Sequence, residues 1–264
     1  MPFISASAIT PYNSIRGGAA GEAIDPILAY SPFNVWDSEH VTIDGNATTL
    51  LDYNNVGTAL DLVNPAASNQ PSYNASSSDF NSLPSFTFNG SSDYVEKTIS
   101  GYRESDSTGI FISVFRNLSD VNNLTMQISD SSQTIRYFNR ITYNSSTFRT
   151  INLTNALAGF SSYRGSTNVE NTTPKLLVHG STGSEYKMWV GDTSQTITML
   201  SGVNDGSIWL DDYASYDKIS IGSLIRNSGI DYSNIEWCFS GYFPYVDDAT
   251  TLEIIAILKT KYGI

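Results

Sequence analysis

The chain has one cysteine, two histidines and few basic residues, and each of these shortages excludes a class of protein. Because Cys238 is the only cysteine among 264 residues, no intrachain disulfide can form. Only 14 Lys and Arg stand against 26 Asp and Glu, and the net charge of -12 argues against binding to nucleic acids or anionic membrane surfaces. No apolar run approaches the length of a membrane span. We therefore expect neither a nucleic-acid partner nor a membrane partner.

The scarcity of histidine also restricts the catalytic chemistry that the chain can perform. Most nucleophilic triads need a histidine, and no His/Cys spacing here fits a zinc site. His179 ends an apolar run and is predicted to be a hydrogen-bonded residue of the core or its rim. His40 lies in a polar turn and is expected to be solvated. Cys238 lies in an apolar segment, which predicts a small core residue rather than a reactive thiol.

Short strand-like segments separated by turn residues make up most of the chain. Asp44-Gly45 and Asn89-Gly90 each follow such a segment and predict tight hairpins, and Asp205-Gly206 is interpreted first as a further hairpin turn. Residues 109–115 are apolar at nearly every position, which predicts a central strand buried on both faces. Other predicted strands are 124–129, 135–139, 148–153, 175–179, 185–190, 218–222 and 235–243. This spacing predicts a sandwich or barrel.

The tryptophans of the predicted strands divide into core residues and candidates for a surface. Trp237 alternates with Ile235 and Phe239, which places the three on one face of the strand, and Trp237 is expected to be a core residue. Trp36 lies beside Phe33 and is expected to pack either in the core or against the N-terminal arm.

One amphipathic helix is predicted at the C-terminus, from Leu252 to Tyr262 and ended by Gly263. Thr250 and Glu253 have the spacing of a capping box, and two aspartates precede them where they oppose the helix dipole. The predicted core-facing stripe is Leu252, Ile255, Ala256, Leu258 and Tyr262.

Residues 1–24 differ from the rest of the chain, and we interpret them as an N-terminal arm. The run Gly17-Gly18-Ala19-Ala20-Gly21 predicts a flexible joint between this arm and the domain of residues 25–264. The arm is nearly uncharged, and five large side chains would be costly to leave in water. These assembly residues are Phe3, Ile4, Ile9, Tyr12 and Ile15. Docking on a neighbouring subunit by strand addition is one interpretation, and an edge strand of the same domain or a frayed end is the other.

Two segments carry specific motifs. The first is residues 69–88 with the turn Phe-Asn-Gly-Ser-Ser-Asp-Tyr at 88–94, and the second is the terminal strand, acidic turn and helix that end in Lys-Tyr-Gly-Ile. Together these segments resemble the laminin-G-like members of the concanavalin A-like jelly-roll superfamily. The second is similar to modules of bacterial surface proteins and tailed-phage virion proteins. The resemblance covers most of residues 25–264 and implies an all-β, antiparallel jelly-roll sandwich with a short C-terminal helix. The arm lies outside the family and is similar to short anchoring segments of phage structural proteins.

The catalytic pattern of this superfamily is absent from the sequence. Its retaining glycosidases use a Glu-x-Asp-x-x-Glu strand that points its carboxylates into one cleft. The nearest run here begins at Glu104 and Asp106, but Gly109 replaces the second glutamate, and the polar stretch predicts a loop. We therefore expect a protein without enzymatic activity, and a diverged glycoside hydrolase is the least favoured alternative.

Aromatic and acidic residues supply candidates for a carbohydrate or calcium site. Exposed rings beside polar groups are typical of lectin sites, and the candidates are Trp189, Trp209 and Tyr213. The alternation of residues 185–190 places Trp189 on the charged face, which leaves both an exposed and a buried ring open, and the alternative for Trp209 is a half-buried residue in a turn. Carboxylates suit Ca²⁺, and the candidate ligands are Asp205, Asp211 and Asp212. Calcium is the one cofactor that the sequence leaves open.

The first hypothesis for function is a structural or adhesion protein on the surface of a tailed-phage virion. Residues 1–6 lack the basic and apolar regions of a secretory signal, so we expect synthesis in the host cytoplasm. The N-terminal arm would contact other virion proteins, the protein would form a homo-oligomer, and an exposed face would bind a host glycan. The second hypothesis is a free carbohydrate-binding, lectin-like module.

Overall fold

The computed structural model describes residues 25–53, 60–119, 125–133, 137–144, 148–155, 159–166, 172–212 and 216–264, and shows an antiparallel jelly-roll sandwich with a C-terminal helix. Within these residues one sheet has eight strands. Its order is β15 (Thr193–Ser194), β14 (Tyr186–Val190), β13 (Lys175–Ser181), β8 (Gly109–Asn117), β20 (Asn234–Phe243), β6 (Ser85–Asn89) and β5 (Ser72–Asn74), with β1 (Asn34–Asp37) also paired to β20.

The second sheet has ten strands within the described part of the chain. Its order is β16 (Thr198–Ser201), β12 (Gly159–Arg164), β11 (Phe148–Asn155), β10 (Tyr137–Asn144), β9 (Gln127–Ser129), β17 (Lys218–Ile221), β7 (Val95–Thr98), β4 (Leu62–Val63), β3 (Ala47–Leu50) and β2 (Val41–Asp44). The strands β18 (Ser223–Arg226) and β19 (Gly229–Tyr232) form a separate hairpin. Short 3-10 helices are η1 (Pro26–Tyr30), η2 (Ala67–Asn69), η3 (Ser78–Phe80) and η4 (Leu210–Asp212), and the α-helix is α1 (Asp248–Tyr262).

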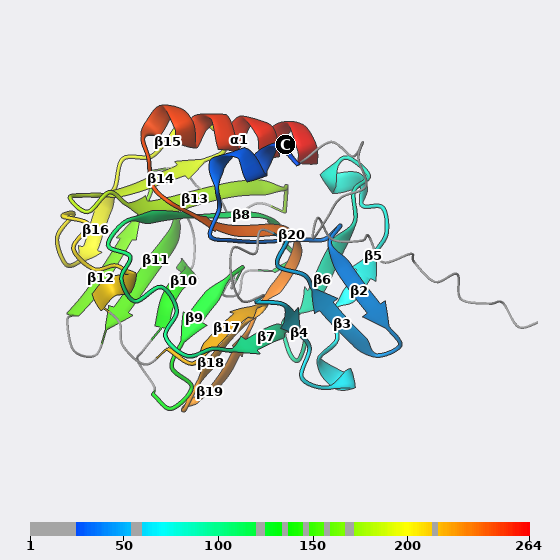
Figure 1. Ribbon diagram of the computed structural model, residues 1–264. Helices are drawn as coiled ribbons and strands as arrows, with labels where there is room; N and C mark the ends of the chain where they lie inside the picture. The colour runs from blue at the N-terminus through cyan, green and yellow to red at the C-terminus, as the bar shows by residue number, and fades with distance from the viewer. Residues whose placement is uncertain are drawn as a thin grey trace, which may run out of the picture.

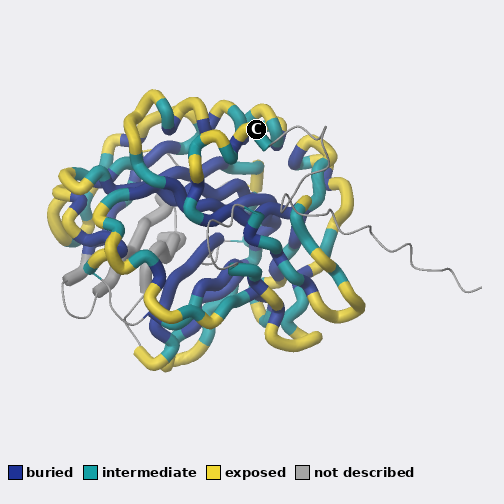
Figure 2. The backbone as a smooth tube through the Cα atoms, viewed as in Figure 1, coloured by how far each residue is buried: buried dark blue, intermediate teal, exposed yellow. Residues whose placement is uncertain are grey.

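Two hydrophobic layers hold the fold together, one on each face of the eight-stranded sheet. The layer between the two sheets joins β8 and β20 to β7 and β17, for example through Phe111, Trp237 and Ile219. The other layer lies between the eight-stranded sheet and α1, which covers its outer face in Figure 1, and it contains Val178 and Leu258. The tube in Figure 2 is accordingly buried along the central strands and exposed along the outer side of the helix.

The predicted central strand is confirmed as β8, which lies between β13 and β20. Its side chains alternate between the two layers, with Phe111 and Phe115 toward the second sheet and Ile110, Ile112 and Val114 toward α1. Each such burial contributes roughly 1.5–3 kcal/mol. A strand that contributes to both layers has to be apolar throughout, which explains its unbroken hydrophobic run.

The predicted strand at 235–243 is confirmed as β20, but its expected alternation is broken by an irregularity at Cys238. Opposite β8, Trp237 pairs with Phe115 and Phe239 pairs with Val114, so one extra residue lies between them. Such a bulge reverses the faces beyond it. Trp237 is therefore buried between the sheets as expected, whereas Phe239 is buried under α1, and the prediction that they share a face is wrong. Cys238 is a core residue, as expected, and burial raises the pKa of its thiol.

The C-terminal helix is confirmed, but it begins earlier than predicted. The carboxylate of Asp247 accepts a hydrogen bond from the backbone N–H of Thr250 at 2.7 Å, so Asp247 is the N-cap and the predicted capping box is wrong. Glu253 instead accepts a hydrogen bond from the Tyr30 hydroxyl at 3.1 Å. Gly263 ends the helix at φ 69°, as predicted.

The buried stripe of α1 is shifted from the predicted one. Leu252 and Ala256 are exposed, contrary to prediction, because the helix presents a different face to the sheet. The buried residues are Thr251, Ile254, Ile255, Leu258 and Tyr262.

Of the three predicted turns, only the first closes a hairpin. Asp44 pairs with Ala47 across the β2–β3 turn, where Gly45 has φ 57°. Asn89–Gly90 instead carries the chain from β6 in one sheet to β7 in the other, so the predicted hairpin is wrong there. Asp205–Gly206 lies between β16 and η4, and the Asp205 carboxylate accepts a hydrogen bond from Ser207 N at 3.0 Å.

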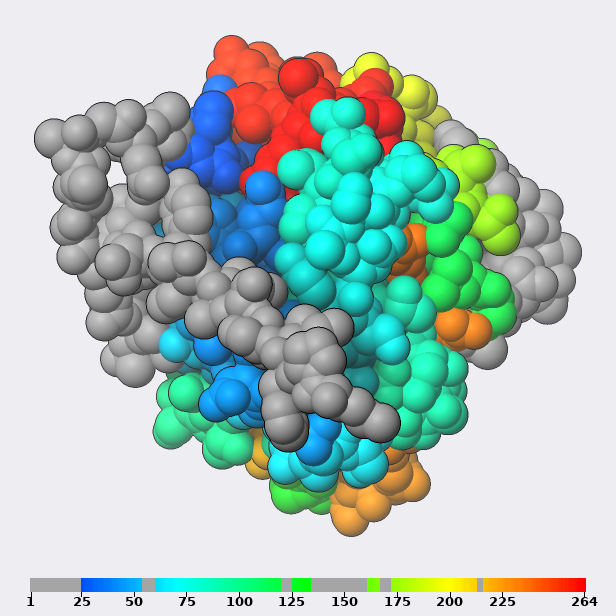
Figure 3. All heavy atoms as spheres, turned by 90° about the vertical axis from the view of Figure 1, so that its right-hand side faces the viewer, coloured from blue at the N-terminus to red at the C-terminus, as the bar shows by residue number. Residues whose placement is uncertain are grey.

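An ion cluster ties the end of α1 to the first described strand. Lys261 Nζ lies 3.0 Å from Asp37 Oδ2, 2.8 Å from Glu39 Oε2 and 3.2 Å from Asp25 Oδ2. Figure 3 shows this end of the helix beside η1 and the segment at 70–85, where the Asn81 side chain donates a hydrogen bond to Lys261 O. Burial alone would raise the pKa of Asp37, but the Lys261 ammonium and the His40 hydrogen bond hold it well below its usual range.

His40 is half-buried and His179 is buried, so neither ring is fully solvated. His40 Nδ1 is 2.7 Å from Asp37 Oδ1 and its ring stacks on Tyr53, so the expectation of a solvated His40 is wrong. Burial would lower the pKa of His40, but the hydrogen bond and charge of Asp37 raise it above its usual value. His179 is a buried core residue, as predicted, with Nδ1 3.2 Å from the Tyr163 hydroxyl, and burial lowers its pKa to about 3.

We predict that the two histidines give opposite pH dependences of stability. Folding raises the pKa of His40, so the protonated ring stabilises the folded state. This stabilisation is complete below the unfolded pKa of about 6.5 and is lost as the pH rises through the pKa of the folded state. His179 protonates readily only in the unfolded chain, so it lowers stability as the pH falls below about 6.5, by up to about 1.4 kcal/mol per pH unit.

Urea unfolding of His40→Gln and His179→Asn at a series of pH values from about 5 to about 8 tests this assignment. His40→Gln should lack the loss of stability that wild type shows above about pH 6.5, and His179→Asn should lack the loss below it. If the free energy of unfolding of both variants changed with pH as it does in wild type, the described environments of the two rings would be contradicted.

Candidate functional site

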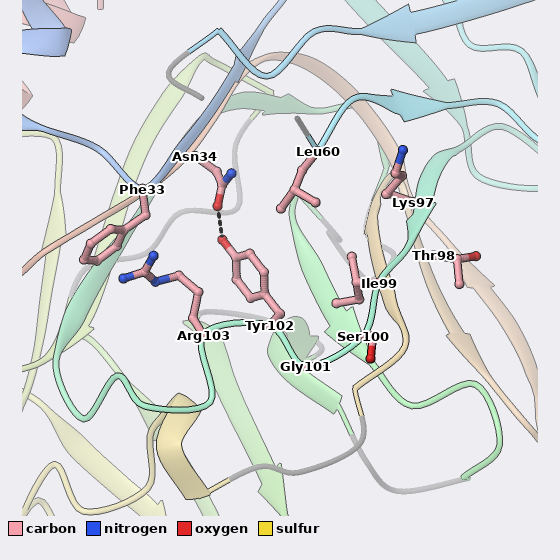
Figure 4. A pocket seen from close by; sticks show the side chains of 10 residues that line it. All are labelled: Phe33, Asn34, Leu60, Lys97, Thr98, Ile99, Ser100, Gly101, Tyr102 and Arg103. Atoms are coloured by element: carbon pink, nitrogen blue, oxygen red, sulfur yellow. Dashed lines mark hydrogen bonds between the residues drawn. The ribbon is translucent and has the colours of Figure 1, made fainter. Parts of the chain in front are cut away.

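A hollow of about 450 Å³ opens where β1, β7 and the loop after β7 meet. Figure 4 shows its walls, with Phe33 and Arg103 at one end, Lys97 at the other, and Leu60 and Ile99 between them. The described residues that line it are Phe33, Asn34, Leu60, Lys97, Thr98, Ile99, Ser100, Gly101, Tyr102 and Arg103. The hollow is thus lined by residues at the edge of the eight-stranded sheet and by residues of the loop that follows β7 in the ten-stranded sheet.

The loop after β7 adopts an unusual backbone conformation at the hollow. Gly101 has φ 62°, which glycine tolerates, but Arg103 has φ 52°, which costs a residue with a Cβ roughly 1–2 kcal/mol. A left-handed residue of this kind persists only where its surroundings hold it, and such residues are concentrated at binding sites. The strain therefore has to be offset by the contacts of the Arg103 side chain.

Two contacts hold Arg103 in place. Its guanidinium lies 3.4 Å above the centre of the Phe33 ring, a cation–π contact worth roughly 0.5–2 kcal/mol. It also donates two hydrogen bonds to the carboxylate of Asp106, one from Nε and one from Nη2. Asp106 N in turn donates to Arg103 O at 2.9 Å. The planar group is thereby fixed at one end of the hollow.

A chain of hydrogen bonds fixes the back wall. The Tyr102 hydroxyl donates to Asn34 Oδ1 at 2.6 Å, and Asn34 Nδ2 donates to Asp52 Oδ2 at 2.5 Å. Asp52 also accepts a hydrogen bond from Val35 N at 3.1 Å. Burial raises the pKa of Tyr102 well above its usual value, so the hydroxyl stays protonated and remains a donor. The wall is polar, preorganised and connected to strand β1.

Lys97 supplies a second positive charge at the opposite end. It lies two residues after Val95 on β7, on the side of the strand that faces the space between the sheets, and it is half-buried. Among the described residues Lys97 forms no ion pair, and no aspartate or glutamate lines the hollow. The two charged residues among the described lining, Lys97 and Arg103, are thus both cationic, although Asp106 pairs with Arg103 and the Glu104 carboxylate lies beside Gly101.

The tryptophans proposed from the sequence do not form a surface site. Trp189 lies on the opposite face of β14 from Met188, as the alternation predicts, but this face is covered by α1 and the ring is 1% exposed. Trp209 is fully buried between the sheets, and its Nε1 donates to the Tyr242 hydroxyl at 3.1 Å. Neither ring has a free face on which a sugar could stack, so the predictions that Trp189 and Trp209 bind a carbohydrate are wrong. Tyr213 lies outside the described residues.

The proposed calcium ligands are engaged in local hydrogen bonds. Asp205 accepts from the Ser207 hydroxyl at 2.7 Å, and Asp212 Oδ2 accepts from Trp209 N at 3.1 Å. Burial raises the pKa of Asp211, which disfavours the charged form that a cation needs. In the described part of the chain no three acidic, histidine or cysteine side chains gather as metal ligands. Calcium therefore has no support from these three positions.

The residues that line the hollow were missed by the sequence reasoning. Tyr102 and Arg103 follow Ser100-Gly101, and an aromatic and a basic residue directly after a turn is a weak signal that could have been noticed. Phe33 and Asn34 carried no signal, because they lie about 70 residues away and reach the loop only through the pairing of β1 with β20. The acidic run at 104–106 lies in a loop as predicted, with Asp106 bound to Arg103.

Comparison with known proteins shows a shared fold. The sequence matches no protein-family model and no curated protein. The structure is similar to the binding domain of botulinum neurotoxin DC in complex with SialylT, with a TM-score of 0.54 and 11% identity over 86% of this chain and 50% of that one. It is also similar to the CBM40 of a Ruminococcus gnavus sialidase bound to α2,3-sialyllactose, with a TM-score of 0.47 and 12% identity over 62% of this chain and 97% of that one. The likeness to the neurotoxin domain supports the β-sandwich fold alone and is not specific to phage proteins.

Several expectations are left untested by the structure. The arm residues Phe3, Ile4, Ile9, Tyr12 and Ile15 lie outside the described residues. The virion setting, the homo-oligomer and the boundary at residue 24 stay predictions. Within the described ranges, no helix has the length and apolar character needed to cross a membrane.

We predict that Trp189 stabilises the fold and does not take part in ligand binding. Trp189→Ala would leave a large cavity between β14 and α1 and should lower the free energy of unfolding by about 3–5 kcal/mol. Lys187→Ala on the same strand is the matched control, because its ion pairs with Glu185 and Asp248 are partly exposed and worth at most about 1 kcal/mol. Urea unfolding measures both changes, and equal, small effects would show that the helix does not cover this face.

Proposed function

We propose that this protein is a non-enzymatic carbohydrate-binding module and that its saccharide site is the hollow between Phe33 and Lys97. The observation that carries the proposal is the preorganised wall of Phe33, Arg103, Tyr102 and Asn34. Saccharide sites combine an aromatic face for the C–H groups of a sugar ring with fixed polar groups for its hydroxyls. The hollow offers the fixed polar groups, and its apolar surface comes from Leu60 and Ile99, because Arg103 covers one face of the Phe33 ring and Tyr242 packs 5.0 Å from that ring. Its volume falls in the range of about 300–1,000 Å³ that small-ligand sites have.

The structural likeness supports this proposal from a second direction. The neurotoxin domain of the same fold is described as a binding domain in complex with SialylT. A fold alone does not determine function, because one sandwich can host many activities. The proposal therefore depends on the hollow, and the likeness supports only the fold on which the hollow is built.

The absence of a usable acid pair at the hollow favours binding over hydrolysis. Glycoside hydrolysis needs two carboxyl groups that flank the scissile bond. The described residues that line the hollow include no carboxylate, and Asp106 beside it is held by Arg103. We therefore assign the hollow a binding role.

A glycan array probed with the full chain, with and without Ca²⁺, tests the proposal, followed by calorimetry on the best saccharide. Phe33→Leu keeps an apolar side chain but removes the ring, and it should weaken binding by about tenfold, equivalent to about 1.4 kcal/mol. Tyr102→Phe removes the hydrogen bond to Asn34 and should weaken binding in the same direction.

Tyr245→Phe is the control for these variants. Tyr245 lies near the start of α1, where its hydroxyl donates to Asp248 at 2.8 Å, and it does not line the hollow. It should bind as the wild type does. An array without hits under both conditions, from folded protein, would refute the proposal.

A virion setting for this module is a separate proposal that the N-terminal arm motivates. The apolar arm before a glycine-rich joint would tether the module to other virion proteins or to further copies of the chain. If so, deletion of residues 1–21 should abolish incorporation into the assembled particle while leaving saccharide binding intact. Unchanged incorporation of the truncated chain would exclude this role of the arm.

A further inference from the structure

We propose that the hollow selects saccharides that carry a negative group, a carboxylate or a sulfate. This inference rests on the proposed saccharide site and adds the chemical class of its ligand. The cations at its two ends carry the argument, because they lie in a chain whose overall charge is strongly negative. A negative ligand would be attracted to the hollow, whereas the rest of the surface would repel it.

Lys97 carries a positive charge that no carboxylate among the described residues neutralises. Four of the five other lysines, Lys187, Lys218, Lys259 and Lys261, each lie within 3.4 Å of a carboxylate oxygen, and the fifth, Lys175, lies outside the hollow. Lys97 has no such partner among the described residues and is nevertheless half-buried on the inward side of β7. Partial burial of an ammonium group without a counter-ion is costly, and a bound anion would remove that cost.

Arg103 has hydrogen-bond donors that Asp106 does not use. Asp106 accepts two of its hydrogen bonds, through Nε and Nη2. A guanidinium has five N–H donors in a fixed plane, so three remain. The stack on Phe33 and the bond to Asp106 hold that plane in one orientation. A preorganised guanidinium suits the planar carboxylate or the sulfate of a sugar.

The lining of the hollow places its two cations around an apolar floor. Figure 4 shows Lys97 and Arg103 at opposite ends, with the apolar side chains of Leu60 and Ile99 between them. An anionic group held at either end would leave the sugar ring over this apolar floor, within reach of Tyr102 and Asn34. The ligand class that fits is therefore an oligosaccharide with an acidic group on one residue.

Calorimetry with three related probes tests the inference: lactose, sialyllactose for a carboxylate and sulfated lactose for a sulfate. We expect one or both acidic probes to bind at least tenfold more tightly than lactose, and their affinity to fall as NaCl is raised, since salt screens the attraction. Comparing the two acidic probes identifies which group is preferred.

Charge-removing variants distinguish the hollow from the charge of the whole protein. Lys97→Gln should weaken binding of the acidic probes by about tenfold more than it weakens binding of lactose. Lys175→Gln removes the same charge from the start of β13, outside the hollow, and should leave all three affinities as in wild type. Lys97→Arg should restore binding of the acidic probes.

The outcomes separate this inference from the proposed function. Equal affinity for lactose and the acidic probes, or equal effects of Lys97→Gln and Lys175→Gln, would overturn the charge selection while saccharide binding stands. Hits confined to neutral saccharides on the array would overturn it as well. Failure of every saccharide to bind would instead refute the proposed function.

Discussion

The fold depends on burying both faces of the eight-stranded sheet at once. Its inner face packs against the second sheet, and its outer face would expose Val178, Trp189 and Phe239 if α1 were absent. The helix is held over this face by its apolar stripe and by the cluster in which Lys261 meets three carboxylates, including fully buried Asp37. Buried charges persist only when they are paired, so the cluster specifies where the helix ends and stabilises it there.

The candidate site follows from how the two sheets meet. Strand β1 pairs with the end of β20 and brings Phe33 and Asn34 to the edge of one sheet. The chain that leaves β7 in the other sheet then supplies Tyr102 and Arg103, which bond to and stack on those two residues. A rigid sandwich thus holds a short, strained loop against a strand edge. Binding residues on loops that a scaffold positions are a common arrangement.

Particular residues show why some predictions succeeded and others failed. β8 was predictable because a strand buried on both faces must be apolar throughout, and this pattern is local. Trp189 could not be placed, because its alternation gives the face of the strand but not what covers that face, and α1 lies about 60 residues further along the chain. The faces of Phe239 were misassigned because a single bulged residue reverses the alternation and leaves no mark in the sequence.

The amino-acid sequence by itself determined the antiparallel sandwich, the terminal helix with its glycine cap, and the lack of a carboxylate pair at the usual positions, because each of these follows from local patterns of side chains. Only the tertiary structure decided which rings are exposed, where His40 finds its partner, and that Phe33, Lys97, Tyr102 and Arg103 surround one hollow. These residues are brought together by strand pairing across most of the chain, and the energy of such long-range contacts depends on the folded geometry rather than on neighbouring residues in the sequence.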